Sequence, residues 1–490
     1  MHPISLFYWG NHMIYIYLQG HDKMNEVQTA VQIFMPNEKY KPENQIMDEG
    51  MTICSVLDGM TAWAYLYEDG QRQCSYRYDA DENGKEKTVR YAIKAAVYYM
   101  LKNKTGIRVP WGMMTGIRPA KRINTYMDEG LTADESAKKL ISLYEMTEDK
   151  AELAKNVALA EREILKKADS NGISLYIGIP FCPSRCLYCS FTSYPLQQYA
   201  NKVDDYVNAL IKELKFLGEK AEGKRLDSIY IGGGTPTSLT AGQLERLMNE
   251  VGTRFNVSGL LEYTVEAGRP DTITADKLKV IKANGADRIS INPQTMNDKT
   301  LKLIGRNHSV EDIQRVYNEA RDAGHENINM DLILGLPGEG EHEVQHTISE
   351  IELLAPENMT VHTLAIKRAS RLRETLEEFD LAKGAALMEK LIQISSDGAK
   401  RMGLSPYYLY KQKNMLGSFE NVGYAKKGCE SVYNVVIMEE TQSIYAAGAG
   451  ASTKLYDSQT GRIERIFNVK NVDEYISRID EMIDRKRKGM

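Results

Sequence analysis

The sequence contains little cysteine, no long hydrophobic run and no large excess of charge of either sign. With 6 cysteines among 490 residues and no recognisable signal peptide, we expect reduced thiols rather than a disulfide framework. No apolar run approaches the roughly 20 residues that cross a bilayer, and the apolar stretch 1–9 is too short and lacks the basic start of a secretory signal. The net charge of -5 gives no indication of nucleic-acid binding. Together these absences predict a cytoplasmic protein with no membrane span.

Residues 1–168 are predicted to form an N-terminal accessory region. Its first part, to about residue 110, has the pattern of an α+β unit, with strands near 14–18, 51–56, 61–67 and 73–79 and helices near 23–36 and 87–103. The remainder is helical, and Met13, just before the first strand, is a candidate for the native start. Cys54 and Cys74 fall in strand-like alternation and are expected to be buried as small hydrophobic side chains.

Residues 169–403 repeat one pattern six times: an apolar strand, a polar turn and an amphipathic helix. This repetition predicts a parallel sheet that curls into a barrel, with function at the carboxyl ends of the strands. The last strand ends near 366, and residues 404–490 follow as a C-terminal region expected to cover the substrate. The strands are expected near 174–180, 227–231, 261–267, 286–292, 327–334 and 359–366.

Three cysteines, Cys182, Cys186 and Cys189, lie within eight residues directly after the first of these strands. Three thiolates on one loop suit a [4Fe-4S] cluster that is normally held by four, so one iron is left open to bind and activate a ligand. Structural zinc, the alternative, takes four ligands, usually in two separated pairs, and no second pair follows at that spacing. The loop therefore predicts an iron-sulfur cluster.

The ends of the following strands carry residues suited to ligand binding. Residues 232–237 form a glycine-rich run that lets a ligand approach the backbone closely. Glu266, Gln294 and Asp331 end the third, fourth and fifth strands. Each feature by itself is weak, since a glycine-rich turn or a lone polar side chain is often only structural.

The C-x3-C-x2-C spacing, the tyrosine before Cys189 and the run Tyr176-Ile-Gly-Ile-Pro-Phe-Cys182 resemble the radical S-adenosylmethionine (SAM) superfamily. Within it they resemble the oxygen-independent coproporphyrinogen III oxidase/dehydrogenase family and its heme-chaperone relatives, and the whole chain is most similar to the HemZ type. The resemblance implies a partial (β/α)6 barrel that binds a [4Fe-4S] cluster and SAM. The SAM-binding residues that it implies are Tyr176, Tyr188, Gly233, Gly234, Thr235, Glu266, Gln294, Arg306, Asp331 and Ala365.

The resemblance also implies a role for several of these residues. Gly233, Gly234 and Thr235 would support the amino group of SAM, and Arg306 would face its carboxylate, for which arginine is a natural bidentate partner. Gln294 and Asp331 would bind the ribose.

The implied reaction starts with one electron from a donor such as flavodoxin or ferredoxin. SAM is cleaved, and a 5′-deoxyadenosyl radical takes a hydrogen from a propionate of the tetrapyrrole coproporphyrinogen III, which loses CO2 and becomes a vinyl group. Lys367, Arg368 and Arg371, after the sixth strand, are candidates to bind the substrate's carboxylates. The alternative is a heme chaperone, because Ser190 and Phe191 follow Cys189 where dehydrogenases have a fourth cysteine two places on.

Three further patterns are expected to have ordinary structural roles. His342, Glu343 and His346 match the H-E-x-x-H signature of zinc proteases, but the motif opens a solvated helix and lacks a third ligand. The loop 448–453 lacks the third glycine of a dinucleotide site and is expected to be a packed loop. The basic end 485–488 closes a helix, where cations interact favourably with the helix dipole, so the run does not require an anionic binding partner.

Overall fold

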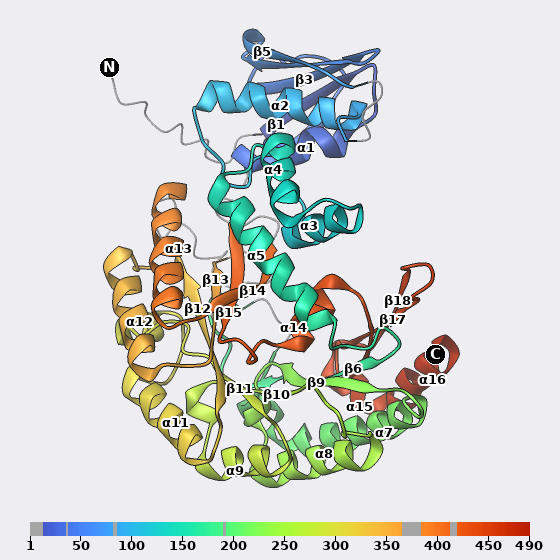
Figure 1. Ribbon diagram of the computed structural model, residues 1–490, viewed down its shortest axis with the longest axis vertical. Helices are drawn as coiled ribbons and strands as arrows, with labels where there is room; N and C mark the ends of the chain where they lie inside the picture. Colours follow the sequence, from blue (N-terminus) through green and yellow to red (C-terminus); the bar gives the residue numbers. More distant parts are fainter. Residues whose placement is uncertain (1–12, 36–37, 82–85, 190–192, 365–383, 412–418) are drawn as a thin grey trace. The chain divides into compact units, whose positions relative to one another are not determined.

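The computed structural model describes residues 13–35, 38–81, 86–189, 193–364, 384–411 and 419–490 (Figure 1). Ala365, Lys367, Arg368 and Arg371 lie outside these ranges. The chain forms two compact units, one of residues up to 155 with 411–419 and one of residues 156–410 with 420–490, called here the N-terminal unit and the barrel unit. The borders predicted at residues 168 and 403 stay predictions. None of the described helices is long and apolar enough to span a membrane.

The N-terminal unit contains the predicted α+β fold. Its sheet has the order β2-β1-β3-β4-β5, with β1 parallel to both neighbours and β3, β4 and β5 antiparallel. Alternate residues of β4, namely Ala62, Ala64 and Leu66, are buried in one hydrophobic core with residues of the two helices α1 and α2. The elements are β1 Met13–Gln19, α1 Met24–Phe34, β2 Lys39–Glu43, β3 Met51–Asp58, β4 Thr61–Glu68, β5 Gln71–Asp79 and α2 Val89–Thr105.

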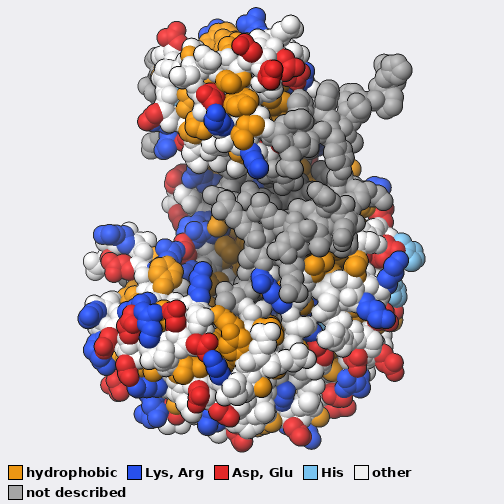
Figure 2. Space-filling view, turned by 180° about the vertical axis from the view of Figure 1, so that it is seen from behind, with side chains coloured by type: hydrophobic (Ala, Val, Ile, Leu, Met, Phe, Trp, Pro, Cys, Tyr) orange, Lys and Arg blue, Asp and Glu red, His pale blue; other side chains and the backbone are white. Residues whose placement is uncertain are grey.

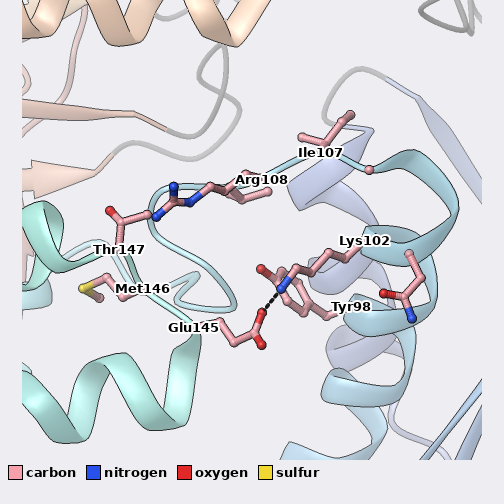
Figure 3. A pocket seen from close by; sticks show the side chains of 10 residues that line it. Tyr98, Lys102, Ile107, Arg108, Glu145, Met146 and Thr147 are labelled. Carbon is pink, nitrogen blue, oxygen red and sulfur yellow. Dashed lines mark hydrogen bonds and ion pairs between the residues drawn. The ribbon is translucent and has the colours of Figure 1, made fainter. Parts of the chain in front are cut away.

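Three helices continue the N-terminal region, as its helical pattern predicts: α3 Pro119–Asp128, α4 Ala133–Tyr144 and α5 Glu148–Leu165. Thr132 begins α4 with a capping box, in which its side chain and that of Glu135 satisfy each other's backbone N–H groups. A pocket of about 460 Å³ lies between the end of α2 and the start of α5 (Figure 3). Lys102 and Glu145 face each other across it as an ion pair.

The barrel unit confirms the six strand–helix repeats. Six parallel strands are neighbours in the order β13-β12-β11-β10-β9-β6, and Figure 1 shows helices along their outer side. Most residues of these strands are buried, as the nearly unbroken apolar runs predict. The strands are β6 Ile173–Ile179, β9 Leu226–Gly233, β10 Glu262–Gly268, β11 Arg288–Ile291, β12 Asn327–Leu334 and β13 Asn358–Thr363. The helices between and after them are α7 Val203–Lys220, α8 Ala241–Arg254, α9 Ala275–Ala283, α10 Asp298–Leu303, α11 Val310–Asp322, α12 Glu341–Leu354 and α13 Gly384–Arg401.

The C-terminal strands extend this sheet on both sides. β15 is antiparallel to β13, and β16 is parallel to β6, so the described sheet has 11 strands. The short helix α14 Val432–Glu439 connects the two sides. The added strands are β14 Ser405–Lys411, β15 Glu420–Ala425, β16 Ser443–Ala447, β17 Ser452–Tyr456 and β18 Ile463–Phe467.

A buried polar network fastens the end of the chain to α7. Glu213 on α7 and Lys486 on α16 Ile479–Gly489 form an ion pair in which both side chains are 0% exposed. Asn468, Tyr475 and the Gly448 N–H also donate hydrogen bonds to the Glu213 carboxylate, at 2.8, 2.6 and 2.9 Å. The helix thus turns Lys486 of the basic end inward, where it pairs with an acidic residue of the same chain.

The loop at Gly448 is packed, as predicted. A Cβ atom at this position would lie 2.5 Å from the Gly178 carbonyl oxygen, and the backbone has a φ of +110°, which favours glycine. On the face of the molecule that Figure 2 shows, Lys and Arg side chains are interspersed with Asp and Glu, in keeping with the small net charge.

Candidate active site

The three cysteines lie on one loop at the carboxyl end of β6. Cys182 ends the short strand β7 Phe181–Cys182, and Cys182 and Cys186 are buried while Cys189 is half-buried. Backbone hydrogen bonds hold the loop in place: Leu187 N–H donates to the Ile304 carbonyl at 3.0 Å, and Cys189 N–H to that of Cys186 at 3.1 Å. Burial raises the pKa of the Cys182 thiol, and the charges of Cys189 and Cys186 raise it further. The Cys182 thiol is therefore harder to ionise than a free thiol, and a metal centre bound to it would favour the thiolate.

The glycine-rich run lies directly against this loop. A Cβ atom on Gly234 would lie 2.7 Å from the Phe181 carbonyl oxygen and 3.0 Å from Cys182 Sγ, so only glycine permits this approach. Next to it, Thr235 Oγ1 lies 3.4 Å from Cys182 Sγ. The structure thus brings together two motifs that are about 50 residues apart in the sequence.

The donor set, three thiols on one loop, has the chemistry of a [4Fe-4S] cluster site. Among the residues that the structure describes, no group of three or more His, Cys, Asp or Glu side chains is arranged to hold one metal ion. A cubane cluster takes each thiolate on a different iron, so its ligands share a loop without converging on one point. Cys182, Cys186 and Cys189 would hold three irons of such a cluster, and this loop would supply no ligand to the fourth.

Glu266 links the glycine-rich run to a group of stacked tyrosines. Its carboxylate accepts hydrogen bonds from Tyr230 Oη at 2.5 Å and from the Gly233 N–H at 3.2 Å. Burial raises the pKa of Glu266 to about 7, so both protonation states are accessible near neutral pH. Tyr230 stacks on Tyr433 of α14 with ring centroids 4.6 Å apart, and Tyr176 stacks beside both.

Gln294, three residues past the end of β11, lies beside Asp331 of β12. Asp331 does not end its strand as predicted, because β12 continues to Leu334. Gln294 has a φ of +70°, a strained backbone conformation for a residue other than glycine, and is 7% exposed. Two backbone hydrogen bonds to β12, one from Gln294 N–H to the Asp331 carbonyl and one from Ile333 N–H to the Gln294 carbonyl, hold it there at 2.9 Å each. Strain that neighbouring residues maintain in this way is typical of functional sites.

The Asp331 carboxylate is held in its ionised form. Its Oδ1 accepts a hydrogen bond from Asn329 Nδ2 at 2.7 Å, and its Oδ2 lies 3.9 Å from His362 Nε2. Burial alone would raise the pKa of Asp331, but these contacts outweigh burial and hold the pKa below its usual range. Asp331 is therefore suited to accept hydrogen bonds, as a ribose-binding carboxylate must.

Arg306 connects the cysteine loop to the end of β11. Its guanidinium donates hydrogen bonds to Tyr188 Oη at 2.9 Å and to the Asn292 carbonyl at 2.6 Å. Arg306 is 6% exposed, and its buried Nε has no hydrogen-bond partner among the described residues. A buried donor left in this state has the character of a site that a carboxylate ligand completes.

Sequence reasoning missed four residues of this site: Tyr230, Tyr433, His362 and Arg269. Tyr230 and His362 lie on strands that were predicted. Their positions in the strand pattern, between core residues, could have indicated that their side chains face the site. Tyr433 comes from the C-terminal region, and no local pattern indicated that it would reach the strand ends. Arg269 directly follows β10 and contacts Cys186.

The His and Glu residues of the zinc-protease motif are neither buried nor arranged to hold a metal ion. His342 and His346 are exposed on α12, and the His342 side chain is 92% exposed. Glu343 caps its own helix by accepting the Gly340 N–H at 2.8 Å. A solvated helix start explains the motif.

Comparisons with known proteins agree with this site. The family model of the radical SAM superfamily matches residues 176–351. The chain is 41% identical over 417 residues to the oxygen-independent coproporphyrinogen-III oxidase-like protein HemZ of Bacillus subtilis (strain 168), covering 84% of this chain and 83% of that protein. It is 34% identical over 310 residues to the heme chaperone HemW of the same organism, covering 63% of this chain and 76% of that one.

Among solved structures, coproporphyrinogen III oxidase (HemN) from Escherichia coli, a radical SAM enzyme, matches with a TM-score of 0.53. The match covers 66% of this chain and 73% of that one at 22% identity, so it supports the fold alone. Radical SAM proteins use a [4Fe-4S] cluster and SAM, the two cofactors that the loop and the strand ends fit. The chain therefore belongs to the radical SAM superfamily and, within it, to the family of HemZ-like, oxygen-independent coproporphyrinogen-III oxidase-like proteins.

Proposed function

We propose that this protein is an oxygen-independent coproporphyrinogen III dehydrogenase, which converts propionate side chains of a tetrapyrrole to vinyl groups in heme biosynthesis. The observation that carries the proposal is the junction of the cysteine loop with Gly234 and Thr235, in a chain whose resemblance to the HemZ protein extends over most of its length. The electron would come from a donor such as flavodoxin or ferredoxin. The protein would act in the cytoplasm, where thiols stay reduced.

When bound, the two cofactors supply the one-electron cleavage of SAM and the abstraction of a substrate hydrogen. The residues of this chain would bind and orient the cluster and SAM. Cys182, Cys186 and Cys189 would hold the cluster, and Arg306 would pair with the carboxylate of SAM. The hydrogen bond between Glu266 and the Gly233 N–H fixes the backbone that would face the amino group of SAM.

The ribose and the reacting centre would be held by residues of neighbouring strands. Gln294 and the ionised Asp331 supply an amide and a carboxylate for the ribose hydroxyls. The stacked rings of Tyr176, Tyr230 and Tyr433 present an apolar wall beside them, which would exclude water from a reactive radical. Lys367, Arg368 and Arg371 remain our candidates for the substrate's carboxylates.

A heme chaperone is the second candidate function. Two observations favour it: the 34% identity to the heme chaperone HemW, and Ser190 and Phe191 directly after Cys189, with no fourth cysteine.

Products separate the two functions. The protein, with its cluster reconstituted without oxygen, would be incubated with coproporphyrinogen III, SAM and a reductant, and the products analysed by mass. A dehydrogenase releases CO2 and vinyl-bearing product with consumption of SAM, and Cys186→Ala, the matched control, releases neither. Stoichiometric heme binding without decarboxylated product, under conditions where 5′-deoxyadenosine forms, would refute the dehydrogenase and support the chaperone.

A further inference from the structure

Arg269 is a buried cation at the cysteine loop that the functions assigned so far do not use. It follows β10 directly and is 4% exposed. Its Nη1 donates to the Ser184 carbonyl and to Ser184 Oγ, both at 2.9 Å, and lies 3.8 Å from Cys186 Sγ. One guanidinium nitrogen therefore contacts both the middle of the loop and one of its three thiols.

The other side of the Arg269 guanidinium is held by a carboxylate. Nε and Nη2 donate to the two oxygens of Asp271 at 3.0 and 2.7 Å, a bidentate pair that fixes the plane of the guanidinium. His308 Nδ1 lies 3.8 Å from the same carboxylate. The Arg269 side chain is 5% exposed and that of Asp271 is 16% exposed, so water screens the two charges only in part and they act on the thiol beside them.

A hydrogen-bond donor and a positive charge next to a cluster thiolate change the cluster's reduction potential in a known direction. Hydrogen bonds to the sulfurs and the net charge around a cluster set its reduction potential. Reduction adds negative charge, so a nearby cation favours the reduced state and a nearby anion opposes it. Arg269 and Asp271 therefore act on the potential with opposite signs, Arg269 more strongly because it contacts the thiol.

We propose that Arg269 is a positioning residue for the cluster: it fixes the cysteine loop through Ser184 and raises the cluster's reduction potential through Cys186, while Asp271 limits that rise. Such an adjustment would bring the cluster within reach of a weak biological reductant. It concerns the cluster only and holds for either candidate function.

The competing hypothesis is that Arg269 only holds the cysteine loop in place and has no effect on the reduction potential. The signs of the potential shifts in two variants, one of Arg269 and one of Asp271, separate this hypothesis from the proposal. Arg269→Gln removes the cation and leaves a shorter, neutral amide, and Asp271→Asn removes the anion but keeps a side chain of the same shape. If Arg269 only holds the loop, both variants should have a less well-held cysteine loop, and their reduction potentials should not shift in opposite directions. Arg315→Gln, which breaks an exposed ion pair on α11 with Asp312, serves as the matched control.

The experiment is a potentiometric titration of the full chain with its reconstituted cluster, followed by the electron paramagnetic resonance signal of the reduced cluster, without SAM or tetrapyrrole. At the wild-type midpoint, Arg269→Gln is expected to lower the ratio of reduced to oxidised cluster about tenfold, which for one electron is about 59 mV. Asp271→Asn is expected to raise the ratio, and Arg315→Gln to leave it unchanged.

Shifts of the same sign in the first two variants, or no shift in either, would overturn the proposal. If Arg269→Gln fails to retain a cluster, Asp271→Asn decides alone: a raised midpoint supports the proposal, and an unchanged or lowered one overturns it. Because no tetrapyrrole is present, this outcome does not depend on which substrate the protein takes.

Discussion

Replacing Lys486 by methionine is expected to destabilise the barrel unit by about 3 kcal/mol. Removing one partner of a buried ion pair costs about 3–5 kcal/mol, because the other charge stays buried without compensation. Here the partner, Glu213, keeps the hydrogen bonds from Asn468, Tyr475 and the Gly448 N–H, so we expect the lower end of that range.

Urea denaturation can be followed separately for the two units. Trp63 and Trp111 belong to the N-terminal unit, and the third tryptophan, Trp9, precedes them in the sequence. Tryptophan fluorescence therefore reports mainly on the N-terminal unit, and far-ultraviolet circular dichroism on the whole chain. Lys486→Met is expected to lower the urea midpoint seen by circular dichroism and to leave the fluorescence midpoint nearly unchanged.

Two further variants test the reasoning. Lys488→Met, at an exposed position two residues away, is expected to change stability by less than about 0.5 kcal/mol. Adding Glu213→Gln to Lys486→Met removes the unpaired charge and should recover part of the loss. A circular dichroism midpoint equal to that of the wild type, or a double variant as unstable as the sum of the single ones, would refute the account of Lys486.

Other predictions concern the site itself. Cys186→Ala is expected to lose the roughly four irons that the reconstituted protein binds, because three ligands leave no spare; iron and sulfide analysis that finds a complete cluster would contradict the ligand assignment. Arg306→Ala should weaken SAM binding by about 1.5–3 kcal/mol with the cluster intact, and an unchanged affinity in calorimetry would show the assignment to be wrong. Glu266 has a pKa raised from 4.5 to about 7, so the folded state retains a proton that the unfolded state loses, and stability should fall by about 3 kcal/mol as pH rises from about 4.5 to 7. Glu266→Gln should remove that part of the pH dependence, and identical curves for variant and wild type in urea denaturation would contradict the raised pKa.

Much of the fold could be predicted because each buried parallel strand is a compact apolar run between turns. β12, for example, has the bounds that the pattern gave, Asn327–Leu334. The strand β2 was missed because its five residues, Lys39–Glu43, are mostly exposed and include a proline. The pairing of β16 with β6 joins residues about 270 positions apart, and local periodicity contains no information about such contacts.

The candidate site divides in the same way. The cysteine loop and the glycine-rich run are local patterns, and the structure brings them together. Arg269 is a single arginine after a strand, which no spacing distinguishes from a surface residue until the loop that it contacts is known. The strained backbone of Gln294 depends on hydrogen bonds to β12 and is equally invisible in the sequence.

The place of β16 beside β6 has a consequence for how the protein is made. β6 leads into the cysteine loop, and one of its two hydrogen-bonding edges is covered by residues 443–447, near the end of the chain. A ribosome that has translated the first 400 residues has therefore produced a strand with one bare edge next to three unmetallated thiols. Cluster insertion into a completed site must wait until residues 443–447 have been synthesised, and a nascent chain that stalls before then is exposed to aggregation and thiol oxidation.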